Sequence, residues 1–179
     1  MSSPAPQIES RPATGSVPAA PSAAASGGGE SASAPPAPTV LFDVNVLVAL
    51  ALPAHVHHRA AHRALADLRS WATTPLTESA LVRLLMQPQV AGVPLTGADA
   101  LGILAGMRGD PRWRFIPDTS SLADPTIEPA VLMGHRQVTD LHLVNLAAAS
   151  GCVLATFDAA LAASLAPEDR RYVELLDSR

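Results

Sequence analysis

The chain has 179 residues, 48% of them apolar, and a net charge of -4 at pH 7. This length supports one apolar core, so a single domain is favoured. The acidic balance excludes a global basic field, and all twelve basic residues are arginine. A nucleic-acid partner would therefore have to be met by a local arginine cluster or by metal ions.

The sequence predicts a cytoplasmic protein. No apolar run reaches membrane-spanning length, and the N-terminus lacks the basic region and apolar core of a secretory signal. The single cysteine, Cys152, cannot form an internal disulfide, which favours a reducing compartment.

Residues 1–38 are predicted to be a disordered tail, because 30 of the 38 positions are Ala, Pro, Ser or Gly. An alternative is translation starting at the valine codon of Val40, in which case the tail is a start-site artefact. Residues 39–179 are the predicted globular domain.

From residue 39 onward, short apolar runs alternate with helical stretches, a pattern typical of a parallel sheet covered by helices on both faces. We predict strands at 39–43, 70–73, 113–116, 152–156 and 172–175. We predict helices at 45–51, 55–69, 77–87, 96–107, 127–134, 138–149 and 159–164.

Acidic residues fall where ligands gather in such a sheet, at the carboxyl ends of the strands. Asp43 interrupts the apolar run "TVLFDVNVLVALALP" at the end of the first strand, and Asp158 follows the fourth. Glu78 opens the helix after the second strand, and Asp140 opens the helix that leads to the fourth. Sequence therefore places four carboxylates at one sheet edge.

Each acid alone also fits a helix N-terminus, where carboxylates cap free N–H groups. Helical phase favours a further role, since apolar residues share a face with the acid at i+3, i+4 and i+7. These residues are Leu81, Val82 and Leu85 after Glu78, and Leu143, Val144 and Ala147 after Asp140.

Converging carboxylates repel one another, and a hard divalent cation such as Mg²⁺ or Mn²⁺ removes the conflict. Burial of Asp43 is then explained by metal binding. Asn45 and Thr156 are neutral groups placed to orient the carboxylates or a metal-bound water.

Four segments, "VLFDVNVLVAL", "PLTESALVRLL", "GHRQVTDLHLVNLAAASG" and "LATFDAAL", resemble the acidic motifs of the PIN domain, and in particular the VapC toxins of bacterial toxin-antitoxin pairs. The resemblance covers residues 39–165. It implies a three-layer α/β/α fold with a central, mostly parallel sheet of about five strands. It also implies Mg²⁺- or Mn²⁺-dependent endonucleolytic cleavage of RNA, a VapB-like antitoxin that blocks the site, and a homodimer.

The family's acidic quartet carries over onto Asp43, Glu78, Asp140 and Asp158. By this resemblance Asp43, Asp140 and Asp158 bind the metal directly or through water, and Glu78 completes the site or positions the water. The family's common Asn matches Asn45, and its Ser or Thr before the last Asp matches Thr156.

The segment "HVHHRAAHR" concentrates histidine and arginine. His58 and His62 have the spacing of a zinc-binding pair, but no third ligand stands out. We interpret His55, Arg59 and Arg63 as a basic stripe that either contacts RNA or the antitoxin or simply faces solvent. Arg136 is a further candidate for contact with the RNA backbone.

Two other functions remain open on sequence grounds. One is a catalytically silent PIN module that binds RNA or protein. The other is a haloacid-dehalogenase-like phosphatase, disfavoured because Asn45 replaces its second Asp and the chain has no lysine.

Overall fold

The computed structural model describes residues 38–177, so the prediction for the N-terminal tail lies, apart from Pro38, outside the described residues. The domain is built on one parallel sheet with the strand order β3-β2-β1-β4-β5. The strands are β1 Val40–Phe42, β2 Trp71–Thr73, β3 Trp113–Phe115, β4 Val153–Thr156 and β5 Val173–Leu175. All five predicted strands are confirmed.

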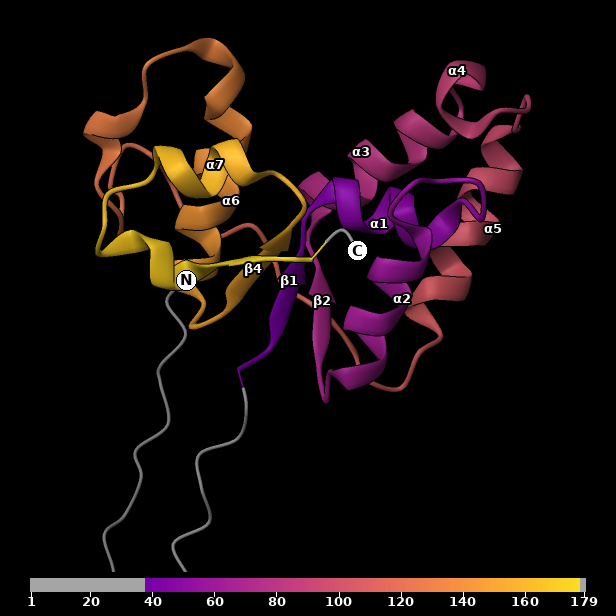
Figure 1. Ribbon diagram of the computed structural model, residues 1–179, viewed down its shortest axis with the longest axis horizontal. Helices are drawn as coiled ribbons and strands as arrows, with labels where there is room; N and C mark the ends of the chain where they lie inside the picture. The colour runs from indigo at the N-terminus through magenta and orange to yellow at the C-terminus, as the bar shows by residue number, and fades with distance from the viewer. Residues whose placement is uncertain (1–37, 178–179) are drawn as a thin grey trace, which may run out of the picture. The chain divides into compact units, whose positions relative to one another are not determined.

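Helices cover both faces of the sheet, and Figure 1 shows α1, α2, α3 and α5 on one side and α6 and α7 on the other. The helices are α1 Val44–Ala51, α2 His58–Asp67, α3 Pro75–Leu85, α4 Pro88–Ala91, α5 Gly97–Arg108, α6 Val138–Ala149 and α7 Ala159–Ser164. Short 3-10 turns are η1 Pro129–Val131, η2 His135–Gln137 and η3 Asp169–Tyr172. This is the expected three-layer α/β/α arrangement. None of the helices in residues 38–177 combines the length and the hydrophobicity needed to cross a bilayer.

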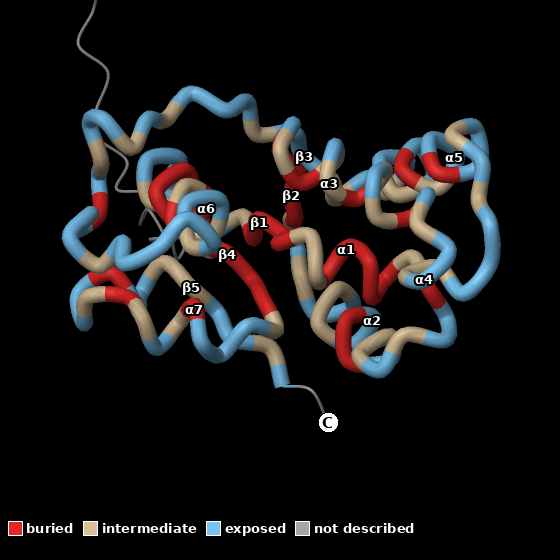
Figure 2. The backbone as a smooth tube through the Cα atoms, turned by 90° about the horizontal axis from the view of Figure 1, so that it is seen from above, coloured by how far each residue is buried: buried red, intermediate tan, exposed pale blue. Residues whose placement is uncertain are grey.

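The central strands are buried on both faces, which explains why β1 reads as an unbroken apolar run. Phe42 faces the core formed with α1, α3 and α5. There its ring stacks on that of Trp71, with 5.3 Å between the ring centres. Leu41 points the other way, into the core formed with α6 and α7. Figure 2 shows β1 and β4 as buried segments between the helical layers. The two cores hold β1 rigidly, and its carboxyl end lies near the middle of the sheet edge.

The predicted helices at 138–149 and 159–164 match the structure to the residue, and four others match it within a few residues. The prediction of a helix at 127–134 is wrong, because this segment forms only the single 3-10 turn η1. Its sole buried apolar residue is Ile127, so no apolar stripe exists to hold a longer helix against the core.

Candidate functional site

Asp43 lies at the carboxyl end of β1 and caps the N-terminus of α1. The residue is 5% exposed, which is unusual for an ionisable side chain. Its Oδ1 accepts a hydrogen bond of 2.6 Å from the backbone N–H of Val44. Capping accounts for one carboxylate oxygen, and the other faces the neighbouring strand β4.

Asn45 and Thr156 both contact this second oxygen. The Asn45 side-chain amide and the Thr156 hydroxyl each donate to Asp43 Oδ2, at 2.7 Å in both cases. The same amide also donates to Thr156 Oγ1 at 2.8 Å, while Asn45 Oδ1 accepts from the Phe157 N–H at 3.2 Å. The structure thus brings both predicted orienting residues against Asp43, and they tie the end of β1 to the end of β4.

Asp158 follows β4 and caps α7, in agreement with the capping interpretation. Its Oδ1 accepts from the N–H groups of Ala160 at 2.8 Å and Leu161 at 3.2 Å. Its own N–H donates to Thr156 Oγ1 at 3.1 Å. Thr156 therefore holds Asp43 and Asp158 beside each other, although Asp158 itself is exposed.

Asp140 reaches the same place from the first turn of α6, where it is half-buried. Burial raises the pKa of Asp140, and the negative charges of Asp43 and Asp158 raise it further. Burial also raises the pKa of Asp43; hydrogen bonds from Thr156 and Val44 oppose that shift, and the Asp158 charge adds to it. Three of the four predicted acids thus form one electrostatically coupled group.

Glu78 sits in a different environment, in the first turn of α3 beyond the carboxyl end of β2. Its Oε1 accepts a hydrogen bond of 2.6 Å from the Thr73 hydroxyl, and its Oε2 lies 3.6 Å from the Arg108 guanidinium. The apolar face predicted for this helix is present, since Leu81 and Leu85 are fully buried.

Sequence reasoning missed the partners of Glu78. Thr73 ends β2 as Thr156 ends β4, so the parallel between the two threonines was a signal available in the sequence. Arg108, which pairs with Glu78, comes from α5, and Trp113, whose indole N–H donates to Thr73 Oγ1, comes from β3. Nothing in their local sequence connects them to this site.

A groove of about 820 Å³ opens beside Glu78, between α3 and α5. Apolar side chains such as Val82, Leu101 and Phe115 line it together with Arg83 and Arg108. Leu101 and Phe115 are 57% and 43% exposed, large values for apolar residues. The predicted acidic edge is therefore bordered by an apolar surface with positive charge on it.

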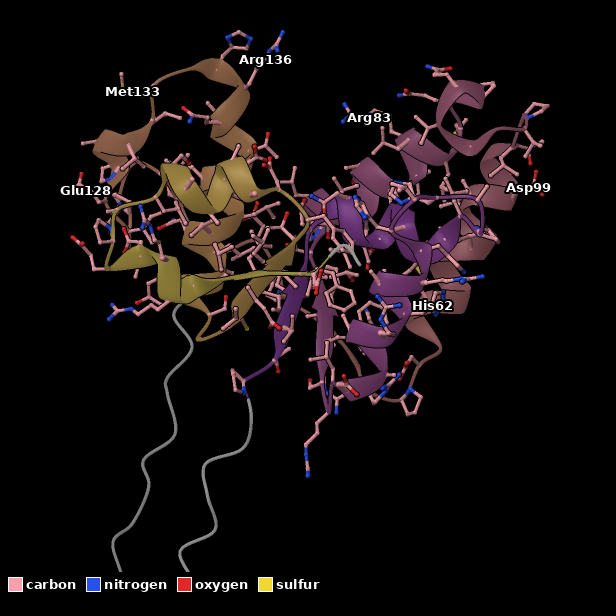
Figure 3. All side chains as sticks on the ribbon, viewed as in Figure 1. His62, Arg83, Asp99, Glu128, Met133 and Arg136 are labelled. Atoms are coloured by element: carbon pink, nitrogen blue, oxygen red, sulfur yellow. The ribbon has the colours of Figure 1, made fainter. Side chains whose placement is uncertain are left out.

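The three residues of the predicted basic stripe lie together, on α2 and the turn before it. His55, Arg59 and Arg63 line a common hollow of about 370 Å³. Arg136 lies in η2, in the layer opposite α2, as its position relative to His62 in Figure 3 shows. The candidate RNA or antitoxin contacts therefore form two separate patches.

His58 and His62 contact the C-terminal carbonyl groups of α1. His58 Nδ1 lies 2.8 Å from the Ala49 carbonyl oxygen, and His62 Nε2 lies 3.3 Å from that of Leu50. Carbonyl groups at the C-terminal end of a helix lack hydrogen-bond partners within the helix, and the two histidines act as those partners. This structural role accounts for the spacing that suggested zinc.

The chemistry of the aspartates decides whether they fit a divalent cation. Within residues 38–177, no three His, Cys, Asp or Glu side chains are arranged as a ready-made metal cluster. Mg²⁺ usually keeps several waters and binds one or two carboxylates plus substrate phosphate, so it requires no such cluster. The coupled aspartates offer hard oxygen donors whose mutual repulsion a cation would relieve. This donor set fits Mg²⁺ or Mn²⁺.

Most of the chain is similar in sequence to known proteins, although no family model matches it. It is 46% identical over 129 residues to Ribonuclease VapC39 of Mycobacterium tuberculosis, covering 70% of this chain and 93% of the relative. Ribonuclease VapC38 of the same organism is 42% identical over 139 residues, covering 76% of this chain and 96% of the relative. Ribonuclease VapC29, also from Mycobacterium tuberculosis, is 40% identical over 125 residues, covering 69% of this chain and 89% of the relative.

Proposed function

Because this chain belongs to the VapC family of PIN-domain toxins, we propose that it is an endoribonuclease that requires Mg²⁺ or Mn²⁺ and acts as the toxin of a toxin-antitoxin pair. The relatives are named as ribonucleases, and this chain carries acids at the carboxyl edge of its sheet. The substrate is an RNA phosphodiester, and the partner is a VapB-like antitoxin that blocks the site.

One observation carries the proposal: the almost fully buried Asp43 is held by Asn45 and Thr156, and its charge is coupled to those of two further aspartates from distant segments. Burying a carboxylate among like charges costs free energy, and a fold gains nothing from it by packing alone. Such an arrangement is what a cation site at a phosphodiester requires.

Asp43, Asp140 and Asp158 are the residues that would hold the cation. When bound, a divalent cation activates water for attack on the phosphorus and stabilises the charge that develops on the phosphate oxygens. Asn45 and Thr156 fix the rotamer of Asp43, so this carboxylate needs no rearrangement when RNA binds. Glu78 lies at the same sheet edge and completes the set. No side-chain nucleophile is required.

The basic hollow of His55, Arg59 and Arg63 is the proposed contact for the RNA backbone, since its guanidinium groups match phosphate geometry. Arg136 is a second proposed contact, on the side of α6. Co-expression with the antitoxin and determination of the mass of the purified toxin test the proposed complex and the proposed homodimer.

The proposal is tested by RNA cleavage with the purified protein, with and without a chelator, and with Asp43→Asn and Asp140→Asn alongside. We expect cleavage that needs Mg²⁺ or Mn²⁺ and is lost in both variants, leaving 5′-phosphate and 3′-hydroxyl ends. Undiminished cleavage in either variant would remove that residue from the site. RNA binding without cleavage under all conditions would instead support a silent binding module.

A further inference from the structure

Glu78 is held on both oxygens by side chains from other elements. Thr73 lies at the end of β2, Arg108 at the end of α5, and Trp113 at the start of β3. Thr73 and Trp113 belong to neighbouring strands of the sheet, so their backbones are fixed relative to each other. We call Thr73, Arg108 and Trp113 the Glu78 clamp.

The direction of the hydrogen bonds in the clamp follows from chemistry. The indole N–H of Trp113 donates to Thr73 Oγ1 at 2.9 Å, because an indole nitrogen can donate but not accept. Thr73 therefore accepts at this contact, and its single hydroxyl proton is left for Glu78 Oε1 at 2.6 Å. Thr73 is fully buried, so water does not compete for that proton.

Arg108 acts on the other oxygen. Its guanidinium stacks 4.4 Å from the centre of the Trp113 ring and 5.6 Å from that of Phe115, and it faces Glu78 Oε2 at 3.6 Å. At this distance the contact is an ion pair rather than a hydrogen bond. Stacking on the two rings restricts a long side chain that would otherwise sample many rotamers.

We propose that Thr73, Trp113 and Arg108 are positioning residues that fix the Glu78 carboxylate for RNA cleavage, with Glu78 acting beside the aspartates and not as a ligand of the cation. This inference rests on the proposed function. A glutamate has three side-chain torsions, and holding both of its oxygens in advance removes the entropy cost of ordering it at each turnover. The clamp is the counterpart of the Asn45 and Thr156 contacts that hold Asp43.

The test compares Thr73→Val, which keeps the β-branched shape but removes the hydroxyl, with Thr73→Ser, which restores it. Thr73→Val is expected to lower kcat about tenfold or more, the size of a missing hydrogen bond to a charged group. KM and the Mn²⁺ dissociation constant should stay within about twofold, because substrate and cation binding do not use the clamp. Thr73→Ser should recover most of kcat. Thr119→Val, an equivalent change at an exposed position, is the control and should leave kcat unchanged.

Trp113→Phe gives an independent result, because it keeps an aromatic ring beneath Arg108 but deletes the indole N–H. It should lower kcat in the same direction as Thr73→Val, with KM unchanged. If either variant weakens Mn²⁺ binding in parallel with kcat, or if kcat stays at the wild-type value in both, the inference is wrong.

A spectroscopic measurement separates failure of the clamp from failure of the proposed function. The Trp113 indole N–H resonance should move in Thr73→Val and in Glu78→Gln, whether or not the protein cleaves RNA. An indole resonance that is unmoved in both variants would overturn the clamp and leave the ribonuclease proposal standing. A resonance that moves in a protein without metal-dependent cleavage would support the clamp and refute its catalytic use.

Discussion

The hydroxyl of Thr156 donates a hydrogen bond of 2.7 Å to Asp43 Oδ2, across 113 positions of sequence. The same oxygen atom of Thr156 accepts from the Asn45 amide and from the Asp158 N–H. A hydroxyl has one proton and two lone pairs, so all of the hydrogen-bonding capacity of the Thr156 side chain is occupied. One side chain therefore sets the geometry of two acids from different strands.

Replacing Thr156 by valine should lower both stability and cleavage. The change leaves the buried Asp43 oxygen without one donor, which costs about 1–3 kcal/mol. It also frees Asp43 and Asp158 from their common contact, so RNA cleavage should fall with it. Thermal unfolding and a cleavage assay measure the two effects. Thr156→Ser keeps the hydroxyl and is the matched control, expected near wild-type activity; equal losses in both variants would argue for packing rather than hydrogen bonding.

Asp140→Asn should stabilise the metal-free protein while abolishing cleavage. Its charge is disfavoured by burial and by the charges of Asp43 and Asp158, so a neutral side chain of similar shape relieves repulsion. The gain should be below about 1 kcal/mol, because Asp140 is half exposed and water screens the repulsion. Unfolding in the presence of a chelator measures it, with the exposed Asp124→Asn as control. A destabilised Asp140→Asn would mean that the coupling is weak.

The pH dependence of stability has a definite sign. The pKa values of Asp43 and Asp140 are raised in the folded state, so between the ordinary and the raised pKa the folded protein binds more protons than the unfolded one. The contribution of these residues to stability therefore decreases as pH rises through this range. In protein kept metal-free by a chelator, Asp140→Asn should make the dependence of the free energy of unfolding on pH less steep. The slope is read from unfolding midpoints measured upward from pH 3.8, the ordinary pKa of an aspartate, and an unchanged slope in the variant would contradict the assignment.

His58→Ala should destabilise the protein whether or not zinc is present. The imidazole is a partner for the Ala49 carbonyl at the end of α1, and removing a hydrogen bond of this kind costs about 1 kcal/mol. Addition of Zn²⁺ should not raise the unfolding temperature of the wild type through this residue. A zinc-dependent gain that disappears in His58→Ala would restore the metal interpretation of the pair.

Arg59→Ala should weaken RNA binding and reduce its salt dependence. Removing one arginine from a phosphate of single-stranded nucleic acid lowers the salt slope of binding by about 0.7. Binding is best measured in the Asp140→Asn background, where RNA is not cut. Arg69, which precedes β2 at the opposite edge of the sheet, provides the control variant Arg69→Ala. An antitoxin contact is indicated instead if Arg59→Ala weakens antitoxin binding and leaves RNA binding intact.

Sequence predicted the sheet well because its strands are short apolar runs bounded by turns, as in β1 and β4. It also predicted that Asn45 and Thr156, which flank acids at strand ends, orient the carboxylates or a metal-bound water, and in the structure both contact Asp43. Two contacts around Glu78 escaped it, because Arg108 reaches Glu78, and Trp113 reaches Thr73, only through the packing of α5 on α3 and the pairing of β3 with β2. Such contacts between distant elements leave no pattern in the local sequence, so they are visible only in the tertiary structure.

Cation binding by the three aspartates is the central claim. Calorimetric titration of the purified protein with Mn²⁺ at neutral pH tests it most directly. The wild type should bind Mn²⁺, with binding abolished or weakened at least about tenfold in Asp43→Asn and Asp140→Asn, as is usual when a ligand or its support is removed. Equal Mn²⁺ affinity in the wild type and both variants would contradict the claim.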